Sequence, residues 1–346
     1  MSNRDIVVIG ASAGGVEAIS QFVKLLPSDL PAALFVVVHF PSFGISVLPQ
    51  ILSRAGSLPA VHPQDGEAIV PGKIYVAPPD YHLLVQRNHV RLSREPGENG
   101  HRPAIDTLFR SAARAYGRRV VGVILTGTLD DGTAGLGIIK ARGGVSVVQD
   151  PEEALFDGMP RSAIENVAVD HILKLAEIAS VLNEISHEPI EEGETVSGEI
   201  DREAKIVFQD KAALERGERP GNPSPLTCPD CGGVLWELQD DNLIRFRCHV
   251  GHAYSSNSLL AEQSNSVETA LWSAIRALEE KAALARRMAV QARQQNRLMS
   301  EAQFRKRAEE AEQHSALVRQ VILQQSENKL RNAIENMEEE RSPNLD

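Results

Sequence analysis

The stretch Asp5-Ile-Val-Val-Ile-Gly-Ala-Ser-Ala-Gly-Gly15 decides how the first half of the chain folds. It joins a continuous apolar run to a glycine-rich turn, and a helical pattern follows directly. An apolar run without polar alternation is typical of a strand buried on both faces, as in a parallel sheet covered by helices. Such runs alternate with helical patterns to about residue 187, which predicts an α/β domain with a doubly wound, mostly parallel sheet in three layers. We expect strands at 5–9, 33–38, 73–76, 83–86, 120–125 and 145–149, and helices at 16–26, 105–116 and 133–142.

Two functional interpretations of the glycine-rich turn remain open, beside that of a plain structural turn. A dinucleotide-binding loop brings backbone amides close to a pyrophosphate and requires the pattern G-x-G-x-x-G. This chain has Ser12 at the position of the second glycine in that pattern. The residues fit G-x-S-x-G instead, in which a tight strand-to-helix turn exposes a serine hydroxyl as a nucleophile. Neither short pattern is specific by itself.

Polar residues follow two further predicted strands. His39 comes directly after the run 33–38, and Asp130 and Asp131 lie in the loop that follows the run 120–125. The carboxyl ends of parallel strands meet at one edge of a sheet, where α/β proteins place their sites. Ser, His and Asp at that edge would provide a nucleophile, a general base and an orienting anion. The chain order Ser–His–Asp differs from that of the α/β-hydrolases and disfavours that family.

The composition is that of an ordinary globular protein and disfavours some classes of function. Of 346 residues, 42% are hydrophobic and 24% are charged, and the net charge is -11. A protein that binds the phosphate backbone depends on clustered Lys and Arg, so we expect no nucleic acid partner. The strongest apolar run, 32–38, is far shorter than the about 20 residues that span a bilayer, and no signal-peptide pattern is present. We therefore expect a cytoplasmic protein without membrane insertion.

Several separated blocks of the chain resemble the catalytic domain of the chemotaxis protein-glutamate methylesterases of the CheB type. They occur in the order of that family and extend the resemblance over residues 5–187. Several blocks in one order are more specific than any one of them. The blocks are IVVIGASAGG around Ser12, the strand that ends in His39, RPAIDTLFRSAA at 102–113, LTGTLDDGTAGL at 125–136 and QDPEEALFDGMPRSAI at 149–164.

The resemblance implies both the site residues and the reaction. Ser12 corresponds to the nucleophile of the family, His39 to the base and Asp131 to the acid, whereas Asp130 sits where the family has no catalytic acid. The reaction of the family is hydrolysis of glutamate methyl esters on methyl-accepting chemoreceptor helices, and the same machinery could deamidate receptor glutamines. The resemblance implies no cofactor for catalysis, and it implies chemosensory signalling proteins as partners.

Two features depart from the pattern of the family. The family commonly carries an N-terminal phosphorylatable receiver domain, whereas this sequence starts directly with the catalytic strand. The family also tends to have Met-Gly after Leu-Thr-Gly, where this chain has Thr128 and Leu129. The resemblance implies that the amides of Ala13 and Thr128 form the oxyanion hole. Because a backbone donor survives a change of side chain, the departure bears on the rate more than on the reaction type.

The three cysteines of the chain fall in one short segment and predict a metal site. Cys228 and Cys231 form a C-x₂-C turn, and Cys248 is followed by His249 and, after a glycine, by His252. A tetrahedral Cys₃His zinc site needs one histidine. We favour His252 over His249, because the glycine lets the chain fold back towards the metal. Ligation by protein atoms alone predicts a structural zinc, and three buried thiols without metal are the alternative.

The chain divides into a catalytic domain, residues 1–187, and three further segments. Residues 188–227 are acidic and contain several prolines, which predicts a linker. Residues 228–255 form the zinc-ribbon-like segment. Residues 256–342 have the composition of long helices with a break near 296–303. We expect these helices to pair as a hairpin or coiled coil, with self-association of two copies as the alternative.

Two hypotheses about function follow. The first is a serine hydrolase that demethylates glutamate methyl esters, and deamidates glutamines, on chemoreceptors of a chemosensory pathway. The second is a catalytically decayed scaffold of a chemosensory complex that acts through its C-terminal tail. The intact set of Ser12, His39 and Asp131 counts against decay, whereas the departure at Thr128 and Leu129 leaves that hypothesis open. A nucleotide-binding protein is a more distant third.

Overall fold

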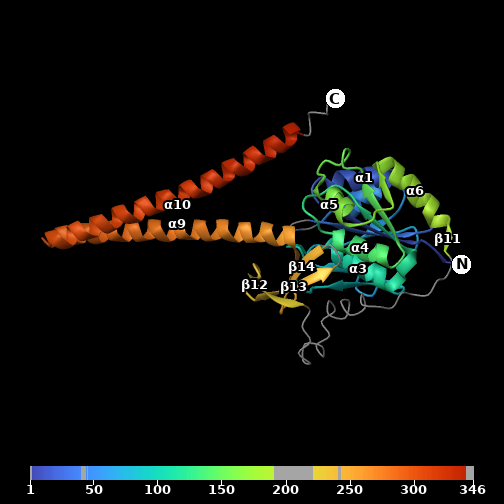
Figure 1. Cartoon of the computed structure of the whole chain (residues 1–346), viewed down its shortest axis with the longest axis horizontal. Coiled ribbons are helices and arrows are strands. Elements are labelled where there is room, and N and C mark those ends of the chain that lie inside the picture. Colours follow the sequence, from blue (N-terminus) through green and yellow to red (C-terminus); the bar gives the residue numbers. More distant parts are fainter. Residues whose placement is uncertain (1, 40–43, 45, 191–220, 241–242, 340–346) are drawn as a thin grey trace. The chain divides into compact units, whose positions relative to one another are not determined.

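Contacts divide the chain into two units, Met1–Leu260 and Ala261–Asp346. The computed structural model describes residues 2–39, 44, 46–190, 221–240 and 243–339. The first unit holds the α/β domain and the segment with the cysteines, and the second holds most of two long helices (Figure 1). Within the described residues, no helix is long and apolar enough to cross a membrane.

A seven-stranded sheet is the centre of the α/β domain, and every pair of neighbouring strands in it is parallel. Strand β2, which ends in the glycine-rich turn, pairs with β8 on one side and with β3 on the other. The strands predicted to carry site residues are therefore direct neighbours. In order across the sheet, the strands are β10 (His171–Leu173), β9 (Val145–Gln149), β8 (Val120–Ile124), β2 (Ile6–Ala11), β3 (Ala33–Val38), β5 (Ile74–Val76) and β4 (Ala60–Val61).

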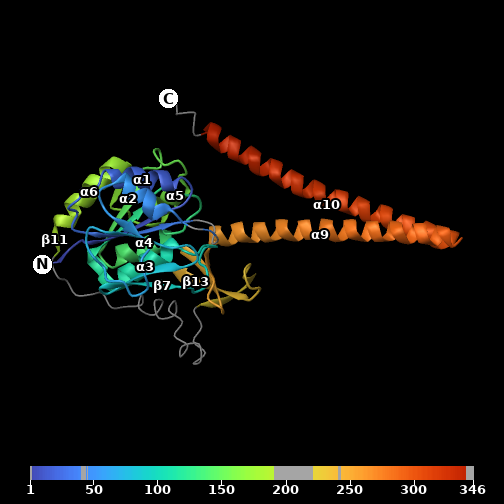
Figure 2. The same ribbon diagram turned by 180° about the vertical axis from the view of Figure 1, so that it is seen from behind.

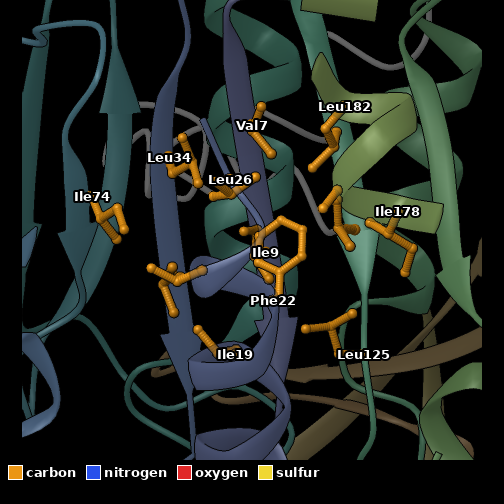
Figure 3. Packing of buried hydrophobic residues seen from close by; sticks show 14 of the residues in the cluster. Val7, Ile9, Ile19, Phe22, Leu26, Leu34, Ile74, Leu125, Ile178 and Leu182 are labelled. Carbon is orange, nitrogen blue, oxygen red and sulfur yellow. The ribbon is translucent and has the colours of Figure 1, made fainter. Parts of the chain in front are cut away.

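Helices cover both faces of the sheet. Successive side chains of β2 point to opposite faces, so they pack against different sets of helices. Val7 and Ile9 belong to a buried cluster with residues of α1, α2 and α6 (Figure 3). Ile6 and Val8 belong to a second cluster with residues of α3, α4 and α5. Figure 2 shows α1, α2 and α6 on one side of the sheet and α3 and α4 on the other, which confirms the three-layer prediction. The helices are α1 (Gly15–Lys24), α2 (Leu48–Ala55), α3 (Ile105–Tyr116), the short 3₁₀ helix η1 (Gly117–Arg119), α4 (Thr133–Ala141), α5 (Gly158–Asn166) and α6 (Leu175–His187).

Two pairs of strands lie outside the main sheet. The predicted strand 83–86 forms as β6 (His82–Gln86), but it pairs antiparallel with β7 (His89–Ser93) in a hairpin of its own. Asn88 in the two-residue turn has φ 67°, the left-handed conformation that such tight turns favour. Near the N-terminus, β1 (Ser2–Asn3) pairs with β11 (Pro189–Ile190), which follows α6.

Residues 221–240 and 243–260, called here the cysteine segment, form a four-stranded antiparallel sheet and the start of a helix. Residues 222–227, which we expected to be part of the linker, form the edge strand β12. Its prolines are compatible with this place, because an edge strand need not donate every backbone hydrogen bond. The rest of the predicted linker, from 191 to 220, lies outside the described residues. The strands are β12 (Asn222–Thr227), β13 (Val234–Asp240), β14 (Leu243–Cys248) and β15 (Ala253–Ser255).

The two long helices are α9 (Ser256–Gln294) and α10 (Leu298–Glu339). The break falls at 295–297, where Asn296 has φ 57°, and overlaps the start of the predicted break at 296–303. Glu279 of α9 accepts a hydrogen bond of 2.7 Å from Arg319 of α10, so the two helices contact each other within one chain. Small side chains are buried along the two helices: Ala282, Ala285, Ala289, Ala292, Ala308 and Ala311.

Leu25 and Leu26 at the end of α1 provide a matched test of the packing in this domain. Leu26 is 3% exposed within the cluster of α1, α2 and α6, whereas Leu25 is 51% exposed. We expect Leu26→Ala to lower the free energy of unfolding by about 2–5 kcal/mol, because it leaves a cavity in a close-packed interior. Leu25→Ala should cost less than about 1 kcal/mol. Equal losses in urea denaturation would contradict this account of the core.

Candidate active site

Ser12 lies in a tight turn between β2 and α1. The turn needs small residues: Gly14 has φ 73°, and a Cβ on Gly15 would lie 2.7 Å from the Cβ of Ala11. The amide of Gly15 donates to the carbonyl of Ser12 at 2.9 Å, which closes the turn. This is the strand-to-helix turn that the G-x-S-x-G interpretation predicts.

The loop after β8 packs directly against this turn. The amide of Ser12 donates to the carbonyl of Thr126 at 3.0 Å, and the Thr126 hydroxyl donates to the carbonyl of Ala13 at 3.0 Å. A Cβ on Gly127 would lie 2.9 Å from the Cβ of Ser12 and 2.2 Å from the sulfur of Met159. Gly127 therefore leaves the space that the serine side chain occupies.

The structure brings Ser12, His39 and Asp131 together at the carboxyl ends of the adjacent strands β2, β3 and β8. His39 Nδ1 lies 3.2 Å from Ser12 Oγ, and His39 Nε2 lies 2.8 Å from Asp131 Oδ2. An ionised carboxylate only accepts hydrogen bonds, so Nε2 carries the proton and Nδ1 is left to accept from the serine hydroxyl. The imidazole is only 6% exposed and the Asp131 side chain 3%. This is the geometry of an activated nucleophile.

The N-terminus of α3 holds the carboxylate of Asp131. The amide of Ile105 donates to Oδ2 at 2.7 Å, and the amide of Asp106 donates to Oδ1 at 3.2 Å. The partial positive charge of a helix N-terminus favours an anion there. Burial alone would raise the pKa of Asp131, but the hydrogen bond and charge of His39, together with the hydrogen bond from the Ile105 amide, outweigh burial and lower this pKa. Asp131 is therefore an anion when His39 needs an orienting partner.

Asp130 has a different role in the structure from its neighbour. Its Oδ1 accepts hydrogen bonds from the hydroxyls of Ser255 at 2.7 Å and Ser258 at 3.1 Å, both in the cysteine segment. Asp131 is the one of the two that contacts His39. The geometry thus separates the two carboxylates in the way that the family resemblance implied.

Two side chains at this site were missed by the sequence reasoning. The ring of His101 stacks on that of His39, with centroids 3.6 Å apart and planes 14° from parallel. Burial and the nearby charge of His39 lower the pKa of His101 to about 4, so this second imidazole is neutral near pH 7. The amide group of Asn99 donates to Asp131 Oδ1 at 2.8 Å. Both residues lie within three positions before Arg102, where a block shared with the family begins. This closeness is the only sequence signal that could have identified them.

The amides of Ala13 and Thr128, the expected oxyanion hole, lie in the two loops that meet at Ser12. Neither amide donates to another group among the residues that the structure describes. Hydrogen bonds hold both loops: the Thr126 hydroxyl donates to the carbonyl of Ala13, and the amide of Met159 donates to the carbonyl of Gly127 at 2.8 Å. Leu129 has φ 61°, which costs a residue other than glycine about 1–2 kcal/mol and explains why glycine suits this position better.

A second cluster of reactive side chains lies in the cysteine segment. One atom each of Cys228, Cys231, Cys248 and His252 lies within 4.8 Å of the others. The sulfurs of Cys231 and Cys248 are 3.7 Å apart, and Cys248 Sγ lies 3.5 Å from His252 Nδ1. Tetrahedral zinc with thiolates at about 2.3 Å places its ligands about 3.8 Å apart, so the cluster fits that metal. His249, the alternative ligand, is exposed and not part of this cluster.

Comparison with known proteins agrees with this geometry. Residues 7–182 match the family described as CheB methylesterase. A "Putative protein-glutamate methylesterase/protein-glutamine glutaminase" of Leptospira interrogans is 38% identical over 192 residues, 55% of this chain and 99% of that protein. A protein of Anaeromyxobacter dehalogenans, "Protein-glutamate methylesterase/protein-glutamine glutaminase 5", is 40% identical over 177 residues, 50% of this chain and 49% of that protein. The crystal structure of the Thermotoga maritima CheB methylesterase catalytic domain is 35% identical, with a TM-score of 0.50, and the match covers 53% of this chain and 98% of that one.

The two neighbouring carboxylates offer a direct test of the site. We expect Asp131→Asn to lower kcat for hydrolysis of a p-nitrophenyl ester by about 10³–10⁴-fold, because an amide cannot hold the imidazole in the required tautomer. Asp130→Asn is the control, since it keeps an oxygen that accepts from Ser255 and Ser258, and it should lose far less. A larger loss for Asp130→Asn would mean that the wrong carboxylate has been assigned to His39.

Proposed function

Because the chain belongs to the CheB methylesterase family, we propose that it is a serine hydrolase that removes methyl groups from glutamate methyl esters of chemoreceptors. The observation that supports this most is the single imidazole that bridges Ser12 and Asp131. A deamidase activity on receptor glutamines follows from the same chemistry, since ester and amide carbonyls are attacked in the same way. The proposed partners are chemoreceptor helices and the signalling proteins that act with them in the cytoplasm.

The proposed reaction begins with attack by Ser12 Oγ on the ester carbonyl. Its proton passes to His39 Nδ1, while Nε2–H stays hydrogen-bonded to Asp131 Oδ2, which stabilises the imidazolium that forms. The amides of Ala13 and Thr128 donate to the oxyanion of the tetrahedral intermediate. His39 then returns the proton to the leaving methoxide, and methanol departs.

The second half of the reaction repeats these steps with water. His39 Nδ1 takes a proton from the water that attacks the acyl group on Ser12, and returns it to Oγ as the glutamate is released. Asp131 remains ionised throughout, consistent with its lowered pKa, which results from hydrogen bonding and charge that outweigh burial. No other reactant is needed. The rival hypothesis, a decayed scaffold, predicts no hydrolysis at all.

Release of methanol from a methylated receptor tests the proposal. We expect the wild-type chain to release methanol and Ser12→Ala to lower the rate by about 10⁴-fold or more, because the nucleophile is lost. Ser180→Ala, an exposed serine of α6, is the control and should keep the full rate. If Ser12→Ala releases methanol at a rate close to that of the wild-type chain, Ser12 is not the nucleophile. No release by the wild-type chain would favour the scaffold.

We also propose that Cys228, Cys231, Cys248 and His252 hold a structural zinc. Two backbone turns present the ligands. The amide of Gly232 donates to the carbonyl of Cys228 at 2.8 Å, and the amide of Cys248 donates to the carbonyl of His252 at 2.9 Å. Four protein ligands leave no open position on the metal, so its role would be to stabilise the fold. The proposal rests on the donor set and its spacing.

Metal analysis of the purified full chain tests this second proposal. We expect about one zinc per chain, lost in Cys231→Ser and His252→Ala because each removes a ligand of a closed site. His249→Ala is the matched control, since it removes the histidine outside the cluster, and it should retain the metal. Retention of zinc by His252→Ala together with loss in His249→Ala would contradict the assignment.

A further inference from the structure

The loop 97–101 lies between the catalytic residues and the cysteine segment. On one side it pairs with β15: the amide of Asn99 donates to the carbonyl of Ala253 at 2.7 Å, and Glu98 forms a parallel bridge with Ala253. On the other side it presents His101 to the ring of His39 and Asn99 to Asp131. A short piece of chain thus joins the two parts of the first unit at the active site.

The side chain of Asn99 uses every donor and acceptor that it has. It is 4% exposed. One hydrogen of its amide nitrogen is directed at Asp131 Oδ1, 2.8 Å away, and the other at Asp106 Oδ2, 3.1 Å away. Its oxygen accepts from the backbone amide of Ser255 in β15, at 2.8 Å. Such a buried, fully satisfied network allows one arrangement only.

The backbone amide of Ser255 decides which way the Asn99 side chain points. An asparagine side chain can exchange its oxygen and nitrogen by a half turn. A backbone N–H can only donate, so Ser255 requires the oxygen of Asn99 to face it. The nitrogen is then directed at Asp131. This carboxylate is ionised and can therefore accept a hydrogen bond but cannot donate one. The cysteine segment therefore orients a hydrogen-bond donor against the carboxylate that holds His39.

Buried charges fix the loop against the cysteine segment. Glu98 is 5% exposed and forms ion pairs with Arg110 of α3 and, at 3.2 Å, with Arg245 of β14. Burial alone would raise the pKa of Glu98, but the arginines outweigh burial and lower this pKa, so Glu98 is ionised. Loss of a partner would leave a buried charge uncompensated, which is costly. The loop is thereby held at a fixed position relative to β15.

We propose that Asn99 is a positioning residue of the active site and that residues 253–255 of the cysteine segment orient it. Asn99 touches neither substrate nor nucleophile; it holds Asp131 in the rotamer that faces His39. The inference rests on the proposed function, because it assigns Asn99 to the same triad. It also gives the cysteine segment a positioning role at the active site, because the amide of Ser255 in β15 orients Asn99.

Substitution of Asn99 in the full chain tests the proposal. We expect Asn99→Ala to lower kcat for methyl ester hydrolysis about 10–100-fold and to change KM less than about twofold, because Asp131 is less well held and substrate binding is untouched. Ser12 should also react more slowly, by a similar factor, with a small organophosphonate that makes no use of the receptor-binding surface. Asn88→Ala is the matched control: Asn88 also has a left-handed backbone, φ 67° against 54° for Asn99, and lies in the β6–β7 turn.

Asn99→Asp separates positioning from docking of the loop. An ionised aspartate keeps an oxygen to accept from Ser255 but brings no donor to Asp131, so at a pH that ionises this carboxyl kcat should fall at least as far as in Asn99→Ala. If Asn99→Asp keeps the full kcat at that pH while Asn99→Ala loses it, only docking matters and the proposal is wrong. It is equally wrong if both variants keep the full kcat in an enzyme that Ser12→Ala inactivates. If the wild-type chain itself shows no hydrolysis, the proposed function has failed instead.

A pair of substitutions at Ser255 tests the contribution of the cysteine segment. Ser255→Pro removes the backbone N–H that orients Asn99, whereas Ser255→Ala keeps it. We expect the proline variant to lose several-fold more kcat than the alanine variant. We also expect the proline variant to add little to Asn99→Ala in the double variant, because both act through one contact. Equal losses in the two Ser255 variants, or full additivity with Asn99→Ala, would overturn the role of β15.

Discussion

The hydrogen bond between His39 and Asp131 is the contact on which the rest of the site depends. It exists because β3 and β8 both lie next to β2, so that the residues after three strands reach one point at the edge of the sheet. Both side chains are buried, and a buried ionised carboxylate is stable only with several hydrogen-bond donors. The N-terminus of α3 supplies two of them and Asn99 a third. The catalytic geometry is thus a property of the sheet order and of one helix start together.

The strands that carry the site could be predicted because burial leaves a simple pattern. A strand covered on both faces must be apolar throughout, and β2, β3 and β8 are. Each run ends where polar residues begin, and this pattern predicts that Ser12, His39 and Asp131 meet at one edge of the sheet. The choice between Asp130 and Asp131 came from the family resemblance. Neither the hydrophobic pattern nor residue propensity distinguishes two adjacent carboxylates in one loop.

Other features could not be predicted because they depend on contacts between distant parts of the chain. The strand β6 has the apolar run of a core strand, yet it pairs only with its neighbour β7, and no local signal distinguishes these outcomes. The prolines of β12 suggested a linker, because proline is excluded from central strands. An edge strand tolerates proline, and the sequence alone does not show that β12 lies at an edge. Asn99 is an ordinary polar loop residue until Ser255, far along the sequence, fixes its orientation.

The contacts of the cysteine segment change how the chain is divided into functional parts. The family match ends at residue 182, so the matched part alone has the nucleophile, the base and the acid. In this chain, however, residues beyond that match contact one carboxylate of the β8 loop directly and the other through Asn99. The hydroxyls of Ser255 and Ser258 donate to Asp130, and the amide of Ser255 donates to Asn99, which donates to Asp131. On the proposed role of Asn99, a change in the cysteine segment reaches Asp131 through two hydrogen bonds, one from Ser255 to Asn99 and one from Asn99 to Asp131. We therefore propose that the family-matched domain supplies the nucleophile and the base, and that the cysteine segment helps to hold the carboxylate that orients the base.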